Sequence, residues 1–212
     1  MMRSSTGPVN MKTRGNLIVI SGPSGSGKGT ICSTLLAEMP DLHLSVSATT
    51  RGPRNGEKDG VDYYFLTRVQ FEQMIAGGRF LEWAEVYGCY YGTPRGPVEE
   101  AINQGKDVVL EIDVQGALQV KTMFPGSVLI FLIPPSRAEL ERRLKNRGTE
   151  SAEAIEQRLN WVEKEIKQAG KYDYLVVNDE VTAAVRKISA IITAERCRPG
   201  LLDIDSFLQQ YW

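Results

Sequence analysis

A glycine-rich run near the amino end of the chain has the residue types and spacing of a phosphate-binding loop. Glycine lets the backbone curl so that several N–H groups point at one anion, and a helix that starts there adds its positive dipole end. Lys28 supplies a mobile charge for the β- and γ-phosphates of a nucleotide. The residues predicted to bind these phosphates are Gly22, Pro23, Ser24, Gly25, Ser26, Gly27, Lys28 and Gly29.

The position after the lysine departs from the usual form of this loop. Ser or Thr commonly stands there and binds Mg²⁺, whereas this chain has Gly29 and then Thr30. We include Thr30 among the candidate ATP-binding residues and leave open which hydroxyl, if any, contacts Mg²⁺. The loop serves ATPases, GTPases and kinases alike, so it does not name a reaction.

A second candidate binding segment spans residues 45–54 and ends with Arg51 and Arg54. The planar guanidinium group can bind one phosphate through two parallel hydrogen bonds. Two arginines in a loop with Gly52 and Pro53 could therefore grip one phosphate, although surface arginines are more often only solvated. The hydroxyl-rich residues before them and the loop upstream favour binding.

Short continuous apolar runs indicate the sheet that must carry these loops. Strands are predicted at residues 17–20, 108–112, 128–133 and 174–177, and helices at 29–38, 115–123, 137–146 and 181–196, with Ser136 as a helix N-cap. Continuous rather than alternating apolar strands are typical of a parallel sheet covered on both faces. The alternation of strand and helix predicts an α/β fold: a P-loop doubly wound parallel sheet.

Two regions interrupt this pattern. Residues 47–96 contain aromatic-rich segments at 61–66 and 80–87 around a short helix at 69–76, which predicts a small β-rich insertion with binding loops. Residues 147–154 turn from basic to acidic before a helix that runs to about residue 169, which predicts a helical lid at about 147–170. The core is then 16–46 and 97–212, and 1–15 is expected to be a flexible leader.

Composition limits the classes of function. The 212 residues carry a net charge of −1, so no global basic field indicates nucleic acid or a membrane surface. Cys32, Cys89 and Cys197 are far apart, which suggests neither a zinc site nor a disulfide framework. No apolar run approaches the roughly 18 residues needed to span a bilayer, and residues 1–14 lack a signal core. We therefore expect a cytoplasmic protein.

The ordered motifs together resemble the guanylate kinase family, which belongs to the P-loop nucleoside monophosphate kinases. The phosphate loop and the 45–54 segment are followed by GE at 56–57, GVDY at 60–63, FLEW at 80–83 and YYGT at 90–93. Further matches are EIDVQG at 111–116, RGTE at 147–150, RL at 158–159 and VND at 177–179. The resemblance covers about residues 16–196. It implies transfer of the ATP γ-phosphoryl group to GMP, and to dGMP, with the 47–96 insertion binding the acceptor.

The resemblance also assigns the acceptor site. The family holds the GMP phosphate with two arginines and two tyrosines, which match Arg51, Arg54, Tyr63 and Tyr91. Guanine N1–H and N2–H₂ can donate together to a carboxylate, and an adenine base would leave that carboxylate unpaired. The matching residues around the base are Ser47, Glu82, Thr93 and Asp113.

Asp113 keeps a second interpretation, because it follows a hydrophobic strand where an acid that organises magnesium would lie. We favour the base-binding role, and give Glu111 no role beyond proximity to the phosphates. By the same resemblance Lys28, Arg51, Arg147 and Arg158 are catalytic and Asn178 lies near ATP. Mg²⁺ is expected to be held mainly through the ATP phosphates and water rather than by protein ligands.

Three other functions remain to be weighed. A kinase for another nucleoside monophosphate, such as AMP, would share the phosphate loop, but Glu82 with Asp113 argues for guanine. A catalytically inactive guanylate kinase-like binding module would keep the pocket and lose nucleotide residues, whereas Lys28, Arg51 and Arg147 are present. The absence of an Asn-Lys-x-Asp motif disfavours a regulatory GTPase. The sequence leaves open whether the chain forms a homo-oligomer, and what residues 201–212 do.

Overall fold

The computed structural model describes residues 14–86, 88–145, 152–201 and 204–212. In this part of the chain five parallel strands form one sheet, in the order β2 (His43–Leu44), β7 (Val108–Glu111), β1 (Leu17–Ser21), β8 (Val128–Ile133) and β9 (Tyr174–Val177). Ile20 of the central strand lies level with Glu111 on one side and Ile130 on the other. The segment after β1 therefore leaves the sheet at its centre, as the predicted doubly wound α/β fold requires.

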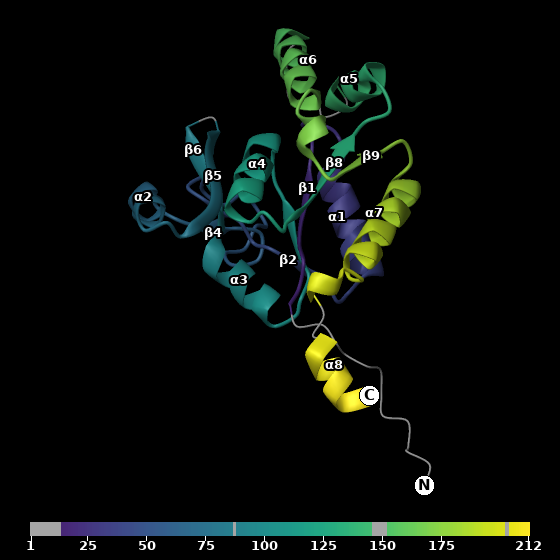
Figure 1. The fold of residues 1–212 in the computed structure, drawn as a ribbon. Coiled ribbons are helices and arrows are strands. Elements are labelled where there is room, and N and C mark those ends of the chain that lie inside the picture. Colours follow the sequence, from purple (N-terminus) through teal and green to yellow (C-terminus); the bar gives the residue numbers. More distant parts are fainter. Residues whose placement is uncertain (1–13, 87, 146–151, 202–203) are drawn as a thin grey trace.

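Helices cover both faces of this sheet (Figure 1). α1 (Lys28–Glu38) and α7 (Val181–Glu195) pack on the side of Ile18 and Ile20, whereas α3 (Arg95–Asn103) and α4 (Val114–Met123) pack on the side of Leu17 and Val19. Since successive residues of a strand point to opposite faces, residues 17–20 of β1 must all be apolar. This burial explains the continuous apolar runs in the sequence.

The insertion builds a smaller sheet of its own, which Figure 1 shows beside α4. Within the described residues its four strands have the order β4 (Tyr64–Phe65), β3 (Ala48–Thr49), β6 (Cys89–Pro94) and β5 (Phe80–Val86). α2 (Arg68–Ala76) closes its back with Phe71, which packs on Ala48 and Phe80. Strand β5 is an edge strand, and it is the one that carries Glu82.

The helices α5 (Arg137–Lys145) and α6 (Ala152–Ile166) stand together above the sheet (Figure 1). Leu140 and Leu144 of α5 pack on Leu159 and Val162 of α6. The predicted N-cap of α5 is confirmed, because the Glu139 N–H donates to Ser136 Oγ at 3.1 Å. The first residues of the predicted lid, 147–151, lie outside the described residues.

Several elements differ from the expectation. Strand β2 and helix α3 were not predicted, since β2 has two residues and the Gly96-Pro97 pair in α3 suggests a loop. Proline is tolerated in the first turn of a helix, where its missing N–H has no intrahelical partner. In the aromatic-rich segment predicted at 61–66, only β4 is a strand, and two short 3₁₀ turns and a last helix complete the described elements. These are Ala169–Lys171, Pro199–Leu201 and α8 (Ile204–Tyr211).

The amino end of the described chain is held by a backbone hydrogen bond to α3. Of the leader predicted at 1–15, residues 1–13 lie outside the described part, while the Gly15 N–H donates to the Ile102 carbonyl at 2.8 Å.

Among the described helices, none combines the length and the apolar composition that crossing a bilayer requires.

Candidate active site

The phosphate loop connects β1 to α1, as the sequence predicts. Gly27 is the N-cap of α1 in the left-handed region, with a φ of 93°, and Lys28 is the first residue of the helix. Lys28 Nζ folds back over the loop and donates to the carbonyls of Gly22 at 2.6 Å and Pro23 at 3.2 Å. The loop is thus closed around its own lysine, and the N–H groups at the start of α1 are left for an anion.

Glycine is required at particular points of this loop. Gly25 has a φ of 87°, and a Cβ there would lie 2.7 Å from Leu140 Cδ1. A Cβ on Gly27 would lie 2.4 Å from Asn178 Nδ2. Both the backbone conformation and the close neighbours therefore exclude a side chain at these positions.

Asn178, predicted to lie near ATP, packs directly against the loop from the end of β9. Its Nδ2 donates to the Ser26 carbonyl at 2.8 Å. Among the described residues, the buried atoms Ser26 Oγ and Asn178 Oδ1 have no hydrogen-bond partner. This hydrogen bond ties the phosphate loop to the end of β9, and the two unpartnered polar atoms lie at the same contact.

Arg143 of α5 joins the same cluster and was not predicted. Its Nη2 donates to the Asn178 carbonyl at 3.0 Å, and its Nε donates to Glu139 Oε1 at 2.7 Å. The sequence offered a weak signal, since the basic end of α5 could equally be a solvated helix face. The structure shows instead that Arg143 points its guanidinium group toward the phosphate loop.

Acidic side chains surround Lys28 on the side of the sheet. Burial lowers the pKa of Lys28, and the charges of Glu111, Glu165 and Asp113 act in the opposite direction. Burial raises the pKa of Glu111, which Lys28 and a hydrogen bond with the Cys32 thiol lower. Glu111 also faces Gly29, because a Cβ there would lie 3.6 Å from Glu111 Oε1. Gly29 thus lies opposite a carboxylate, at the position where this kind of loop commonly has a Ser or Thr hydroxyl.

A cavity of about 270 Å³ opens next to Lys28, between the sheet and the insertion. It brings together residues that are far apart in the sequence and come from both regions. Its lining residues are Lys28, Ser47, Tyr63, Glu82, Val86, Tyr91, Gly92, Glu111, Ile112 and Asp113.

Glu82 is the carboxylate that projects from β5 into this cavity. Its side chain is buried, and Thr93 Oγ1 donates to its Oε1 at 2.7 Å. Burial raises the pKa of Glu82 to about 7, while the Thr93 hydrogen bond acts to lower it. A solvated strand residue would not behave in this way, so Glu82 is a group that needs a ligand donor when ionised.

Asp113 and Gly116 at the start of α4 form the wall opposite the insertion. Asp113 is the N-cap of α4 and accepts from the Gly116 N–H at 2.7 Å. A Cβ on Gly116 would lie 2.7 Å from Glu82 Oε2 and 3.4 Å from Asp113 Oδ1. The glycine therefore lets the two carboxylates approach one place in the cavity.

Arg51 is held by the carboxylate of Glu57, a residue with no predicted role. Its Nη1 and Nη2 donate to Glu57 Oε2 and Oε1 at 3.0 and 2.9 Å, and it also hydrogen-bonds with Tyr91. These contacts raise the pKa of Arg51, which stays charged. The Tyr63 ring lies 5.5 Å below its guanidinium carbon and packs edge-on against Tyr91. The predicted pair of tyrosines thus flanks Arg51.

The cavity next to Lys28 is not lined by Arg54, Thr30 or Thr93, which were also predicted to bind nucleotide. Arg54 is exposed three residues after Arg51, and its backbone N–H donates to Glu57 Oε2 at 2.7 Å. Thr30 is exposed in the first turn of α1, and Thr93 lies behind Glu82 rather than in the cavity wall. Arg147 lies outside the described residues, and of Arg158 only the backbone in α6 is described.

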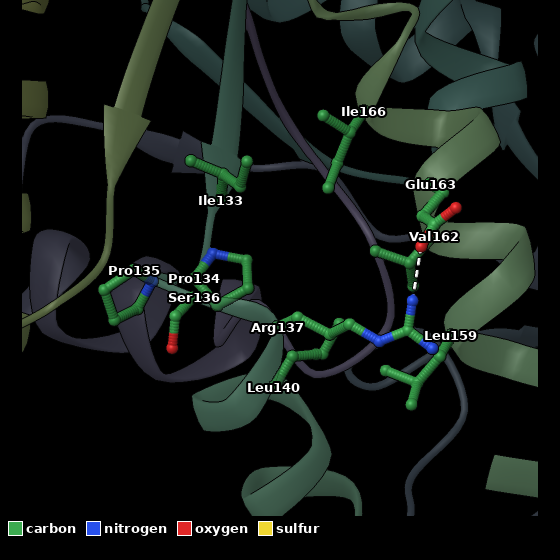
Figure 2. A pocket seen from close by; sticks show the side chains of 10 residues that line it. All are labelled: Ile133, Pro134, Pro135, Ser136, Arg137, Leu140, Leu159, Val162, Glu163 and Ile166. Carbon is green, nitrogen blue, oxygen red and sulfur yellow. Dashed lines mark hydrogen bonds and ion pairs between the residues drawn. The ribbon is translucent and has the colours of Figure 1, made fainter. Parts of the chain in front are cut away.

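A second cavity, of about 170 Å³, lies between α5 and α6 (Figure 2). Its walls are largely apolar, with Ile133, Leu140 and Ile166 pointing inward. Arg137 reaches across from α5 and forms an ion pair with Glu163 of α6, and a second one with Glu156 at 3.3 Å. These exposed pairs join the two helices on the side of the predicted lid.

Comparisons with known proteins agree on one family. The family model described as guanylate kinase matches residues 14–195. A guanylate kinase from Desulfitobacterium hafniense is 54% identical, over 88% of this chain and 94% of its own length. One from Halalkalibacterium halodurans is 56% identical, over 88% of this chain and 92% of its own. A crystal structure of guanylate kinase from Anaplasma phagocytophilum has a TM-score of 0.76 at 33% identity, and covers 95% of this chain and 97% of its own.

Proposed function

The chain belongs to the guanylate kinase family, and we propose that it transfers the γ-phosphoryl group of ATP to GMP, giving ADP and GDP. One observation carries this proposal: the lysine of the phosphate loop and the carboxylate of Glu82 line the same cavity. A phosphoryl donor bound at Lys28 and an acceptor whose base is bound at Glu82 would then share this cavity.

Guanine fits the carboxylates of this cavity better than other bases do. It offers N1–H and N2–H₂ on one edge, and Glu82 can accept from both when it is ionised. Adenine presents an acceptor at N1 and would leave the buried carboxylate with the Thr93 hydroxyl but no donor from the base, which costs on the order of 1–3 kcal/mol. Asp113 and Ser47 supply further polar groups beside the base. We therefore assign Glu82, with Asp113, as the groups that select guanine.

Arg51, Tyr63 and Tyr91 are proposed to bind the GMP phosphate, with Arg54 reaching it from the same loop. Glu57 keeps both terminal nitrogens of Arg51 paired and orients the guanidinium group before the ligand arrives. A phosphate dianion adds charge-assisted hydrogen bonds to the remaining donors of Arg51 and to the tyrosine hydroxyls. The clamp is thus preorganised rather than assembled by the ligand.

Phosphoryl transfer spreads negative charge over the migrating group, so positive groups around it lower the barrier. We propose that Lys28 leaves the loop carbonyls to bind the β- and γ-phosphates, while Arg147 and Arg158 contact the same charge from the lid. Gly22, Pro23, Ser24, Gly25, Ser26, Gly27, Gly29, Thr30 and Asn178 are the remaining proposed ATP-binding residues. Closure of the 147–170 lid and of the 47–96 insertion would exclude water and align the reacting atoms.

Magnesium is part of this proposal. The carboxylate of Glu111 opposite Gly29 is a hard oxygen donor at the start of α1, which suits Mg²⁺ better than a nitrogen or sulfur site would. In the described residues no group of three His, Cys, Asp or Glu is arranged to hold a metal by itself. The ATP oxygens would hold the ion directly, and Glu111 would contribute only through water. When bound, the ion neutralises phosphate charge.

The test is ADP production from MgATP by the purified protein with GMP, dGMP, AMP, UMP or no acceptor. Turnover with GMP and dGMP, and little with the others, is the expected result. A cytoplasmic location belongs to the same proposal, since ATP and GMP are both available there. Turnover with AMP would keep phosphoryl transfer and contradict the guanine assignment. A folded protein with no turnover on any acceptor would favour a binding module.

A further inference from the structure

Gln119 on α4 forms a pair of hydrogen bonds with the backbone of β5, the strand that carries Glu82. Its Oε1 accepts from the Trp83 N–H at 3.2 Å, and its Nε2 donates to the Trp83 carbonyl at 3.2 Å. On its other side β5 pairs with β6, where Trp83 lies opposite Gly92. The side-chain amide thus occupies the place that one residue of a further antiparallel strand would take.

The spacing of contacts along α4 links this amide to the base-binding site. Asp113, Gly116 and Gln119 follow at intervals of three residues, so they lie along one side of the helix. Gly116 leaves room for the Glu82 carboxylate, as the 2.7 Å approach of a hypothetical Cβ shows. Gln119, one turn further on, holds the backbone of the next residue in the strand. One side of α4 therefore meets both the side chain of Glu82 and the backbone that carries it.

Close packing does not fill the space around this contact. A cavity of about 330 Å³ lies between β5 and α4, lined by Phe80, Leu81, Glu82, Trp83, Gln119, Thr122 and Met123. Trp83 and Met123 are exposed on its rim. Leu81 belongs to the same buried cluster as Ala117 and Val120 of α4, whereas Trp83 is exposed and its backbone is held to the helix by the hydrogen bonds of Gln119.

We propose that Gln119 is a positioning residue for base recognition: its amide fixes β5 so that the Glu82 carboxylate stays directed at the base. This inference rests on the proposed function, since it deepens the account of the same acceptor site. Without the amide, β5 keeps its pairing with β6 and the buried contact of Leu81, but loses its hydrogen bonds to α4 at Trp83, the residue after Glu82. The expected consequence is a loss of binding and selectivity at the guanine site, with the ATP site unaffected.

The first variant is Gln119→Leu, which keeps the side-chain volume and removes both hydrogen bonds. The KM and Kd for GMP should rise about tenfold, as two lost hydrogen bonds of ordinary net strength would produce. The KM for ATP and the kcat at saturating GMP should change by less than about twofold, because the phosphate loop is untouched. The preference for GMP over IMP, which lacks the 2-amino group, should fall, since that preference depends on where Glu82 is held.

Two further variants separate positioning from a general structural effect. Gln119→Glu keeps an acceptor for the Trp83 N–H and loses the donor to the carbonyl, so its KM for GMP should lie between those of the wild type and Gln119→Leu. Thr122→Val lines the same cavity, and its hydroxyl donates to the Leu118 carbonyl of its own helix. This control should leave both KM values unchanged, and thermal unfolding should show all three variants folded.

Wild-type turnover with GMP comes first, because its absence would refute the proposed function and not the role of Gln119. With that turnover present, unchanged GMP parameters in Gln119→Leu would overturn the inference. So would equal rises in KM for ATP and GMP, or a higher KM for GMP with the preference over IMP intact. The last result would show that Glu82 stays in place without the amide.

Discussion

The two halves of the site are built in different ways. The phosphate loop is a continuous run of residues whose backbone makes the binding surface, and half of residues 22–29 are glycine, with no room for a side chain at Gly25 and Gly27. The acceptor half is made of side chains that come from several strands and the start of α4. A side chain added at the tightly packed glycines of the phosphate loop should disrupt the loop, but the loop should not distinguish one base from another. Single substitutions in the acceptor half should instead change affinity and selectivity for the base. Substitutions in either half, and the pH dependence of binding, test this division.

Lys28→Met should have the largest effect. It removes the charge that we propose to meet the transferred phosphoryl group, so kcat should fall about a hundred- to a thousandfold, the usual cost of one lost stabilising group in a transition state. The Kd for GMP should change by less than about threefold, because Glu82 and Arg51 remain. Rapid-quench kinetics and calorimetric titration with GMP measure the two quantities. An equally large loss of GMP binding would show that the halves are not separate.

Gly116→Ala places a Cβ where the Glu82 carboxylate now lies. Glu82 must move, and the KM for GMP should rise about tenfold or more, as displacement of a charged hydrogen-bonding group would produce. Gly96→Ala is the matched control, because it also adds a Cβ within a helix and meets nothing within 4 Å. Steady-state kinetics with GMP varied should separate the two. Similar behaviour of both variants would contradict the close approach at Gly116.

The pH dependence of GMP binding should report on Glu82. Its pKa of about 7 means that the carboxylate is mainly ionised at pH 8 and mainly protonated at pH 6. Since the ionised form is the one proposed to accept from guanine, the Kd for GMP should be about tenfold higher at pH 6 than at pH 8. Glu82→Gln should lack this component and keep only the titration of the GMP phosphate. Identical pH profiles for the two proteins would be evidence against the role of Glu82.

The same pKa has a consequence for stability. A carboxyl group whose pKa is raised in the folded state binds more protons folded than unfolded between about pH 4.5 and pH 7. The ionised group therefore lowers the free energy of unfolding by an amount that grows from about pH 4.5 to pH 7 and is fully present above pH 7. This loss of stability is recovered as the pH falls through the same window. Denaturant unfolding of the wild type and of Glu82→Gln should thus diverge toward pH 8, with the variant the more stable protein.

Arg137→Ala should have the smallest effect. The ion pairs to Glu156 and Glu163 are exposed, so their loss should cost less than about 1 kcal/mol of the free energy of unfolding. Turnover at saturating substrates should stay within about twofold. Urea unfolding and steady-state assays measure both. A large fall in kcat would show that these pairs control the lid rather than merely join α5 to α6.

The same contrast explains what the sequence could predict. The phosphate loop and the four core strands were predictable, because each depends on neighbouring residues: glycine spacing in one case and continuous apolar character in the other. Glu57 and Gln119 were not assigned roles, since a carboxylate near an arginine or an amide on a helix is ordinary in sequence. Their partners are set by the turn of one loop and by the docking of β5 on α4. Helix α3 was hidden by Gly96 and Pro97, which the fold accepts at a first turn.

The most direct test of the division between the halves is Glu82→Gln, with GMP and an ATP analogue titrated separately. The change keeps the shape of the side chain and removes its charge, so kcat/KM for GMP should fall about a hundredfold or more, as the loss of a charged acceptor in a buried site implies. The Kd for the ATP analogue should be unchanged within about twofold. Comparable losses for both nucleotides would contradict a guanine-reading carboxylate, and would mean that Glu82 supports the fold of the whole site.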